Sequence, residues 1–500
     1  MPIDLSSLNG PQKEAVLCTE GPLLVLAGAG SGKTRVLTHR IAHLVDDLGV
    51  APWQIMAITF TNKAAAEMRE RLGGLIGPYA RGMWVSTFHS MCVRILRADC
   101  ERLGFASGFT IYDDDDSKRL VKQIYGELNI DEKRFPVPAI RNRISKAKND
   151  LQVAEVFAQE AERGSDPVAK VAARVYTRLQ ERLRQLNAFD FDDLLLYSWL
   201  LLKNHEDVLA SYQKRFLYIL VDEYQDTNHA QYALTQLLAA AHQNIMVVGD
   251  DDQSIYHFRG ARPEIMLNFP EDFKNAETVL LNINYRCSGN ILNTAMKVID
   301  HNENRYVKKL STPNNLGEPV EVKEFKNPRD EYMTAAGILK DRMEKGEYIE
   351  DTAFLFRTNQ EAEGLVAALM EYGVPFTMKE KLPNLFRHWI SRNLMAYLEM
   401  AAGDRNRKTF LEIMNRPNRY IARDALTSAT VSFDALQELY KDKDWMCDRI
   451  TTLETHLRIL STLAPYAAVN FIRKGMGYEQ YLMEYAQYRK IRPEELLEVL

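Results

Sequence analysis

Cysteine is scarce in this chain, and its placement excludes two kinds of site. The 500 residues contain five cysteines, and no two of them form a Cys-x-x-Cys pair. That spacing is needed for the common structural zinc sites, and so few cysteines cannot build the disulfide framework of a small secreted domain. We therefore expect reduced, mostly buried thiols in a cytoplasmic protein. The cysteines are Cys18, Cys92, Cys100, Cys287 and Cys447.

The sequence also lacks long hydrophobic runs and an excess of charge of one sign, and we expect no leader sequence. The longest apolar stretch covers only residues 194–202, whereas a membrane span needs about 20 residues. The start, Met1-Pro2-Ile3-Asp4, has neither the basic nor the apolar region of a signal peptide. The formal net charge is −5, so any nucleic-acid site must be a local patch or cleft. We expect no membrane partner.

The chain is too long for one hydrophobic core, and two kinds of region alternate along it. We expect three or four domains or subdomains. Apolar strand patterns alternate with helical segments up to residue 99 and again from residue 188, which predicts a parallel α/β sheet. Residues 100–187 read as long charged helices and predict a helical insertion. A second α/β region is expected from residue 278, with strands near 278–281, 320–322 and 352–356, followed by helices from 381.

The most informative motif is the run Ala27-Gly28-Ala29-Gly30-Ser31-Gly32-Lys33-Thr34. It lies between an apolar run, 23–26, and a helical pattern, 35–44, which is the context of a phosphate-binding P-loop. Its glycines let backbone N–H groups turn towards phosphate oxygens. Lys33 is expected to reach the β- and γ-phosphates of ATP, and the Thr34 hydroxyl to hold Mg²⁺. Ala27 replaces the first Gly of the strict pattern, and a small-residue turn is the alternative interpretation.

An acidic run, Val221-Asp222-Glu223-Tyr224-Gln225-Asp226, ends a later apolar strand pattern. Acidic residues at the carboxyl end of a central strand lie beside the P-loop in doubly wound folds. Asp222 is therefore a candidate for the Mg²⁺ shell, and Glu223 for orienting and deprotonating the attacking water. Read alone, the run could also be surface acids at a strand end.

A second acidic run, Gly249-Asp250-Asp251-Asp252-Gln253-Ser254, follows the next strand pattern. Gln253 is a candidate sensor of the γ-phosphate or of the attacking water. Tyr256, Phe258 and Arg259 come directly afterwards and would link the ATP site to a base-stacking surface. An aromatic pair in the hydrophobic core is the alternative.

Arg286 lies in the run Asn284-Tyr285-Arg286, at the start of the expected second α/β region. An arginine that faces a P-loop can stabilise the transition state of phosphoryl transfer, an effect worth roughly 10³–10⁵ in rate. A surface salt bridge is the alternative for Arg286.

Further runs complete an ordered set that covers nearly the whole chain. They are Gln12 after Leu8-Asn9, Thr59-Phe60-Thr61-Asn62-Lys63-Ala64, Thr87-Phe88-His89-Ser90 and Asp190-Phe191-Asp192-Asp193-Leu194. Together with the P-loop, the two acidic runs and Asn284-Tyr285-Arg286, in this order, they resemble the UvrD/Rep/PcrA-type superfamily 1 ATP-dependent DNA helicases. His257-Phe258 departs from the family's commoner basic residue followed by Trp, so base stacking with less ring area is expected.

The resemblance implies a role for each matched residue. Gln12 would read the adenine edge, Tyr285 would stack on the base, and Arg35 would help to hold the nucleotide. The residues implied in catalysis are Lys33, Glu223, Gln253 and Arg286, with Thr34 and Asp222 as Mg²⁺ ligands. The residues implied in DNA binding are Phe60, Asn62, Thr87, His89, Phe191, Tyr256, Phe258, Arg259, Arg357, Thr358 and Asn359.

The resemblance also implies an architecture and an activity. Residues 1–99 with 188–277 would form a first RecA-like motor domain, with 100–187 as its helical insertion. Residues 278–380 would belong to a second, incomplete motor domain, and 381–500 to its incomplete helical insertion. ATP hydrolysis between the motors would drive 3′-to-5′ tracking on single-stranded DNA and unwinding of duplex DNA, in DNA repair or replication. Accessory repair or replication proteins are possible partners, and a monomer or weak dimer is expected.

The family's last motifs do not occur before Leu500, so we expect a truncated chain that binds ATP but hydrolyses it poorly. Two other interpretations stay open. The chain could be the helicase portion of a RecB- or AddA-like helicase–nuclease, or an ATP-binding, DNA-binding protein that has lost motor coupling. The compact motif spacing disfavours the first of these, and intact Lys33, Asp222 and Glu223 argue against an inactivated first motor.

Overall fold

The computed structural model describes residues 3–358, 361–378, 388–489 and 492–500. These divide into two compact units, Met1–Val322 and Lys323–Leu500. All five cysteines are free, but only Cys92 and Cys100 are buried, so the expectation of mostly buried thiols is wrong for the other three. Within the described ranges, every helix is too short or too polar to cross a bilayer.

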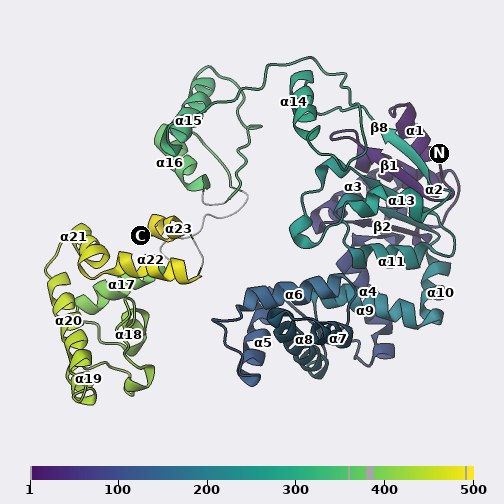
Figure 1. The fold of residues 1–500 in the computed structure, drawn as a ribbon. Helices are drawn as coiled ribbons and strands as arrows, with labels where there is room; N and C mark the ends of the chain where they lie inside the picture. The colour runs from purple at the N-terminus through teal and green to yellow at the C-terminus, as the bar shows by residue number, and fades with distance from the viewer. Residues whose placement is uncertain (1–2, 359–360, 379–387, 490–491) are drawn as a thin grey trace. The chain divides into compact units, whose positions relative to one another are not determined.

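Six parallel strands form the sheet of the first unit (Figure 1), which confirms the expected α/β class. Their order across the sheet is β3-β2-β6-β7-β1-β8. Parallel neighbours must be joined by crossovers, which here are helices on both faces. The strands are β1 (Leu23–Ala27), β2 (Ile55–Thr59), β3 (Trp84–Thr87), β6 (Tyr218–Val221), β7 (Ile245–Gly249) and β8 (Glu277–Leu281).

Helices cover both faces of this sheet, and β1 shows why its sequence is apolar throughout. Successive strand residues point to opposite faces, and all five residues of β1 are buried. Leu24 and Leu26 enter one core, with α4 (Phe88–Asp99), α9 (Phe191–Asn204), α10 (Glu206–Arg215) and α11 (His229–Ala239). Leu23 and Val25 enter the other core, with α1 (Gly10–Leu17), α2 (Lys33–Asp46) and α3 (Asn62–Ile76).

The helical insertion has a hydrophobic core of its own, whose buried members run from Leu120 to Ala188. Phe105 and Phe109 belong instead to the core under the sheet. The insertion therefore starts later than residue 100. Its helices are α5 (Asp114–Glu127), α6 (Val137–Asn149), α7 (Ala154–Arg163) and α8 (Pro167–Gln185), and the parallel pair β4 (Thr110–Tyr112) and β5 (Ala188–Asp190) lies at its base.

A buried ion cluster fastens α6 of the insertion to the start of α9. Lys148 is 1% exposed, and its Nζ lies 2.6 Å from Oδ2 of Asp190 and 2.8 Å from Oδ1 of Asp193. Burial alone would lower the pKa of Lys148, but the two carboxylates raise it. Lys148 therefore stays charged, and the cluster fixes the insertion to the sheet domain.

Strand β8 corrects one expectation about the domains. Residues 278–281 were expected to open a second α/β region, but β8 pairs in parallel with β1, from Leu23 opposite Glu277 to Ala27 opposite Leu281. Residues 320–322 and 352–356, both described, are not strands, and Val322 and Leu355 are each 95% exposed. A strand needs a hydrogen-bonded neighbour, and among the described residues neither of these two segments pairs with a strand.

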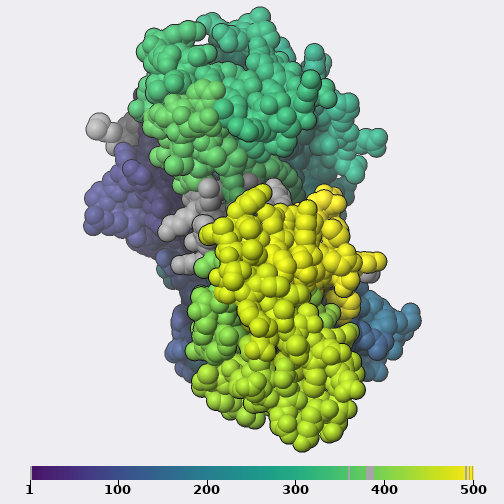
Figure 2. Space-filling view, turned by 90° about the vertical axis from the view of Figure 1, so that its left-hand side faces the viewer, coloured from purple at the N-terminus to yellow at the C-terminus, as the bar shows by residue number. Residues whose placement is uncertain are grey.

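The second unit is helical in its described residues. Helices α15 (Pro328–Glu344) and α16 (Ala362–Tyr372) share a small core. A larger core joins the later helices, whose surface is yellow-green to yellow in Figure 2. These are α17 (Trp389–Ala401), α18 (Arg407–Ile413), α19 (Phe433–Leu439), α20 (Asp444–Leu460), α21 (Pro465–Asn470), α22 (Tyr478–Arg489) and α23 (Pro493–Val499).

Candidate functional site

The P-loop joins the end of β1 to the start of α2, at the carboxyl edge of the sheet. Gly30 has φ 66° and Gly32 has φ 89°, which lie in the left-handed region that glycine adopts most easily. Among the described side chains, none caps the N-terminus of α2. The first N–H groups of that helix have no partner within the helix, and they favour an anion.

Gly30 packs against the segment that carries Tyr285 and Arg286. The Nδ2 of Asn284 donates to the carbonyl of Ala29 at 2.6 Å, and the backbone N of Tyr285 donates to the carbonyl of Gly30 at 3.0 Å. A Cβ on Gly30 would lie 2.7 Å from the Cβ of Arg286. Glycine is therefore needed for both its backbone angle and this close approach.

Gly30→Ala is expected to weaken nucleotide binding by about tenfold or more, because left-handed strain and displacement of the Arg286 segment both act against the loop. Titration of the chain with a fluorescent ATP analogue measures this. Gly49→Ala is the matched control, since Gly49 has φ 71° but nothing within 4 Å of a new Cβ. Equal loss of nucleotide affinity in both variants would contradict the assignment of the loop.

Lys33 and Glu223 are in direct contact. The Nζ of Lys33 donates to Oε2 of Glu223 at 2.8 Å, and the Nε2 of Gln225 donates to the same oxygen at 2.9 Å. Glu223 has φ 52° and ψ 45°, a left-handed conformation that costs a non-glycine residue of order 1–3 kcal/mol and occurs preferentially at functional sites. The carboxylate is thus held beside the P-loop lysine, where it can accept a proton from water.

Asp222 and Thr34 are the candidate ligands of Mg²⁺. Asp222 follows β6, is 5% exposed, and accepts at Oδ1 from the backbone N of Glu223 at 3.1 Å. Burial and the charge of Glu223 raise its pKa to about 7, although Lys33 opposes this. In the part of the chain described, no cluster of three or more acidic, histidine or cysteine residues could hold a metal. Mg²⁺ bound with a nucleotide needs only one or two carboxylates, because phosphate oxygens and water complete its shell, so the two residues fit that ion.

Gln12 and Tyr285 are linked through Asn9, beside the P-loop. The Nε2 of Gln12 donates to the carbonyl of Ser31 at 2.9 Å, and its Oε1 accepts from the backbone N of Asn9 at 3.1 Å. Asn9 also donates from Nδ2 to the Tyr285 hydroxyl at 2.8 Å. Gln12 is 2% exposed and uses its amide inside the chain, whereas Tyr285 is 47% exposed. Tyr285 therefore offers a ring for stacking, and adenine recognition by Gln12 stays a prediction.

Arg35, Gln253 and Arg286 also lie in the first unit. The Nη2 of Arg35 donates to the Ser7 hydroxyl at 2.7 Å, and the Nε2 of Gln253 donates to Oδ2 of Asp250 at 2.7 Å. Arg286 is exposed, next to Gly30. The P-loop, the acidic run after β6, the Gln253 loop and the Arg286 segment are thus assembled within one unit.

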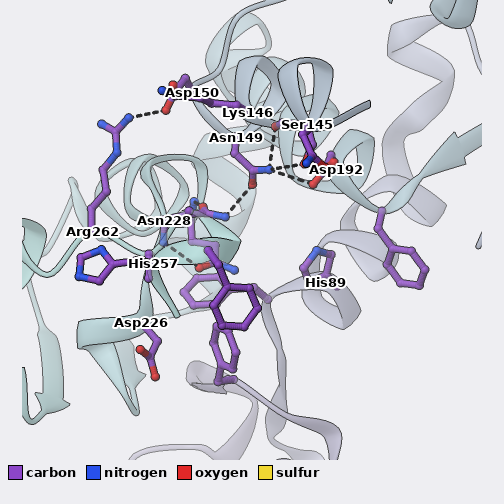
Figure 3. Close-up of a pocket in the computed structure, with 18 residues that line it drawn as sticks. His89, Ser145, Lys146, Asn149, Asp150, Asp192, Asp226, Asn228, His257 and Arg262 are labelled. Atoms are coloured by element: carbon purple, nitrogen blue, oxygen red, sulfur yellow. Dashed lines mark hydrogen bonds and ion pairs between the residues drawn. The ribbon is translucent and has the colours of Figure 1, made fainter. Parts of the chain in front are cut away.

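A cavity of about 880 Å³ lies between the sheet domain and α6 of the insertion (Figure 3). Phe60 lines it and lies on Tyr256, with ring centroids 5.0 Å apart, and Tyr256 is 5.8 Å from Phe258. Phe258 is 78% exposed and Phe191, also in the lining, is 51% exposed. Exposed rings in series are platforms on which nucleic-acid bases stack without sequence preference.

An adjoining cavity of about 620 Å³ contains the polar residues expected near the DNA backbone. Its lining includes Asn62, Thr87 and His89, together with Phe60 and Phe191. Thr87 is 7% exposed and accepts at Oγ1 from the backbone N of Ser90 at 3.3 Å, so it also caps α4. Burial lowers the pKa of His89, which favours the neutral ring.

Sequence reasoning missed the polar face of α6. Asn142, Ser145, Lys146 and Asn149 line the larger cavity, and they follow the i, i+3, i+4, i+7 spacing of one helix face. That spacing was the available signal, but it is shared with any solvated face. The sheet domain lies within hydrogen-bonding distance of this face of α6, because the Nδ2 of Asn228 donates to Oδ1 of Asn149 at 2.7 Å (Figure 3).

Charges of both signs line the larger cavity. Arg262 forms an ion pair with Asp150 across it (Figure 3), and His257 lies in the lining. Burial raises the pKa of Asp192, and burial together with Glu223 raises that of Asp226 to about 6. The lining therefore contains carboxyl groups as well as the guanidinium of Arg262.

The remaining predicted DNA contacts are Arg259, Arg357, Thr358 and Asn359. The backbone of Arg259 lies in a short 3₁₀ helix after Tyr256, but its side chain is outside the described residues, as is Asn359. Arg357 and Thr358 belong to the second unit. There the Thr358 hydroxyl donates to Oε1 of Glu361 at 2.9 Å, and the backbone N of Arg357 to Oε2 at 3.3 Å. Their contact with DNA stays a prediction.

Comparison with known proteins gives matches along both units. Residues 8–274 match the model of the UvrD/REP helicase N-terminal domain, and residues 279–457 match that of the UvrD-like helicase C-terminal domain. A protein of Leuconostoc citreum named ATP-dependent DNA helicase PcrA is 44% identical over 84% of this chain and 56% of its own length. Proteins of the same name from Staphylococcus epidermidis and Staphylococcus aureus are 43% and 42% identical over 87% of this chain and 60% of theirs.

These matches agree with the geometry of the P-loop, the acidic run after β6 and the aromatic cavity. The chain spans 56–60% of the length of these curated relatives. The N-terminal and C-terminal domain models match one after the other along the chain, in agreement with the order of the motifs. The chain therefore belongs to the UvrD/Rep/PcrA type of superfamily 1 helicases.

Proposed function

We propose that this chain provides the ATP site and part of the DNA track of an ATP-dependent DNA helicase that moves 3′ to 5′ on single-stranded DNA. The substrates are ATP with Mg²⁺, single-stranded DNA and duplex DNA. The direction of movement, a role in repair or replication and any accessory partners rest on the family resemblance. Because the chain spans only 56–60% of the length of its relatives, the activity of the whole protein is also part of this proposal.

One observation carries this proposal: a single short segment joins the two sites. Asp250 follows β7 and holds the amide of Gln253, beside the acidic run after β6. Three residues later Tyr256 lies on Phe60, and Phe258 lines the DNA cavity. A conformational change at Gln253, the proposed γ-phosphate sensor, is therefore transmitted to the base-stacking rings through only a few residues. A motor needs such a short connection between its ATP site and its DNA site.

The hydrolysis step follows from the residues at the P-loop. The loop N–H groups and Lys33 bind the phosphates, and Thr34 and Asp222 would hold Mg²⁺, which supplies Lewis-acid stabilisation of the phosphoryl oxygens. Glu223 orients the attacking water and takes its proton. Gln253 senses the γ-phosphate, and Arg286 stabilises charge that develops on the transferred group.

Single-stranded DNA is expected to stimulate ATP hydrolysis by at least about tenfold in the protein as its gene encodes it, because the Gln253 segment couples the sites. Steady-state turnover with and without a poly-dT oligonucleotide measures this. Faster displacement of streptavidin from the 5′ end than from the 3′ end of that DNA checks the direction.

Turnover that DNA does not change would contradict the motor and favour the protein that binds ATP and DNA without coupling. DNA cleavage that depends on ATP would favour the helicase–nuclease interpretation. Each result separates one alternative from the proposal.

A further inference from the structure

Three successive carboxylates, Asp250, Asp251 and Asp252, lie around one buried lysine. The Nζ of Lys308 lies 2.7 Å from Oδ1 of Asp250 and 3.0 Å from Oδ2 of Asp252, and it also pairs with Oδ1 of Asp251. Lys308 is 2% exposed. Arg305 adds a bidentate contact to Asp252, at 2.8 and 3.1 Å.

Lys308 stays charged in this position. Burial alone would lower the pKa of its ammonium, but the charge of Asp250 and the hydrogen bonds to Asp250 and Asp251 raise it. A buried ion pair is costly to assemble and leaves an uncompensated charge when one partner is removed. An ammonium surrounded by three carboxylates is therefore well suited to hold their loop in one conformation.

Asp250 passes this constraint to two groups of the ATP site. Its Oδ2 accepts from Nε2 of Gln253 at 2.7 Å, and its backbone N donates to Oε1 of Gln225 at 3.0 Å. Gln225 in turn donates to the Glu223 carboxylate at 2.9 Å. Lys308 thus directly contacts Asp250, the residue that holds Gln253. From Asp250, two further hydrogen bonds lead through Gln225 to Glu223.

The segment that carries Lys308 also reaches the P-loop from the other side. The backbone N of Ser311 donates to the carbonyl of Asn282 at 3.0 Å, and the backbone N of Asn284 donates to the carbonyl of Ser311 at 2.7 Å. Leu310 lies against Gly28, so closely that a Cβ there would collide with it. Residues 308–311 therefore connect the Gln253 loop to the segment of Tyr285 and Arg286.

We propose that Lys308 is a positioning residue for ATP hydrolysis, which acts by clamping Asp250 and thereby fixing the Gln253 amide and the Glu223 carboxylate. This inference rests on the proposed function, because it assigns Lys308 to the hydrolysis step of that site. Lys308 touches neither nucleotide nor DNA in this role, so its removal should act on turnover and leave binding in place.

Lys308→Met removes the charge and keeps an unbranched side chain that is one atom shorter. In the protein as its gene encodes it, we expect the DNA-stimulated kcat to fall about 10–100-fold, as misplacement of reacting groups does, while KM for ATP and the Kd for single-stranded DNA stay within about threefold. Lys308→Arg keeps the charge and is expected to recover most of the lost kcat. A purely structural role would lower the melting temperature without this split between kcat and KM.

Arg305→Met is the matched control, because Arg305 is a buried cation of the same segment that contacts Asp252 and Asp300. It is expected to keep kcat within about threefold of wild type. If Lys308→Met does not fold, the triple variant Asp251→Asn/Asp252→Asn/Lys308→Met removes the excess negative charge, keeps Asp250, and should show the same loss of kcat.

The two proposals fail in different ways. Wild-type protein without DNA-stimulated turnover would overturn the proposed function. A wild-type protein that turns over normally, with Lys308→Met equal to it or Arg305→Met equally impaired, would overturn the positioning role of Lys308 alone.

Discussion

Glu223→Gln is expected to lower ATP turnover by about 10²–10⁴-fold and to leave nucleotide affinity within about threefold. The amide has nearly the shape of the carboxylate and keeps an oxygen for the contacts from Lys33 and Gln225. It cannot take a proton from water, so the loss falls on the chemical step. Steady-state hydrolysis at saturating ATP and DNA, combined with equilibrium titration of an ATP analogue, separates turnover from binding.

A surface glutamate provides the control for this loss. Glu67 lies on α3, is exposed, and pairs with Arg71 at 3.6 Å. Glu67→Gln removes the same charge outside the site and should retain wild-type turnover. If Glu223→Gln hydrolysed ATP at a wild-type rate, another group would have to accept the proton, and the strained backbone of Glu223 would need a different explanation.

The fold was predictable where the determining pattern is local. The run of β1 is apolar at every position, which is typical of a parallel strand covered on both faces, and all of it is buried. Strand β8 has a similar pattern, but its sequence does not say which sheet it joins. It pairs with β1, some 250 residues earlier in the chain, and such long-range pairing depends on the tertiary fold.

The candidate site divides in the same way. Spacing within one loop predicted the roles of Lys33 and Thr34, and the place of Asp222 at the end of a strand pattern added it to the same hypothesis. Lys308 was not part of this hypothesis, because its partner Asp250 is 58 positions away. Nothing about an isolated lysine in a sequence distinguishes a buried, ion-paired side chain from a solvated one. Lys146 was also not part of it. A polar helix face lines a binding cavity only when another surface lies opposite, as the sheet domain does here.

Phe258→Ala is expected to weaken binding of single-stranded DNA by about 5–150-fold, which corresponds to the 1–3 kcal/mol of stacking on one aromatic ring. Phe258 is 78% exposed, so its removal costs the fold little. Phe60→Ala would remove a ring that Tyr256 lies on at 5.0 Å, so its effect on affinity would include a rearranged partner. Fluorescence anisotropy with a labelled poly-dT oligonucleotide measures the affinity.

The salt dependence of binding distinguishes stacking from charge. A lysine that contacts a phosphate releases counterions, and its loss lowers the slope of log K against log salt by about 0.7 on a single strand. Lys146→Ala, on the α6 face of the cavity, is therefore expected to reduce that slope, whereas Phe258→Ala shifts the affinity and keeps it. Phe258→Ala with wild-type affinity would place the bases elsewhere. A slope reduced equally in both variants would mean that Phe258 organises phosphate contacts instead of a base stack.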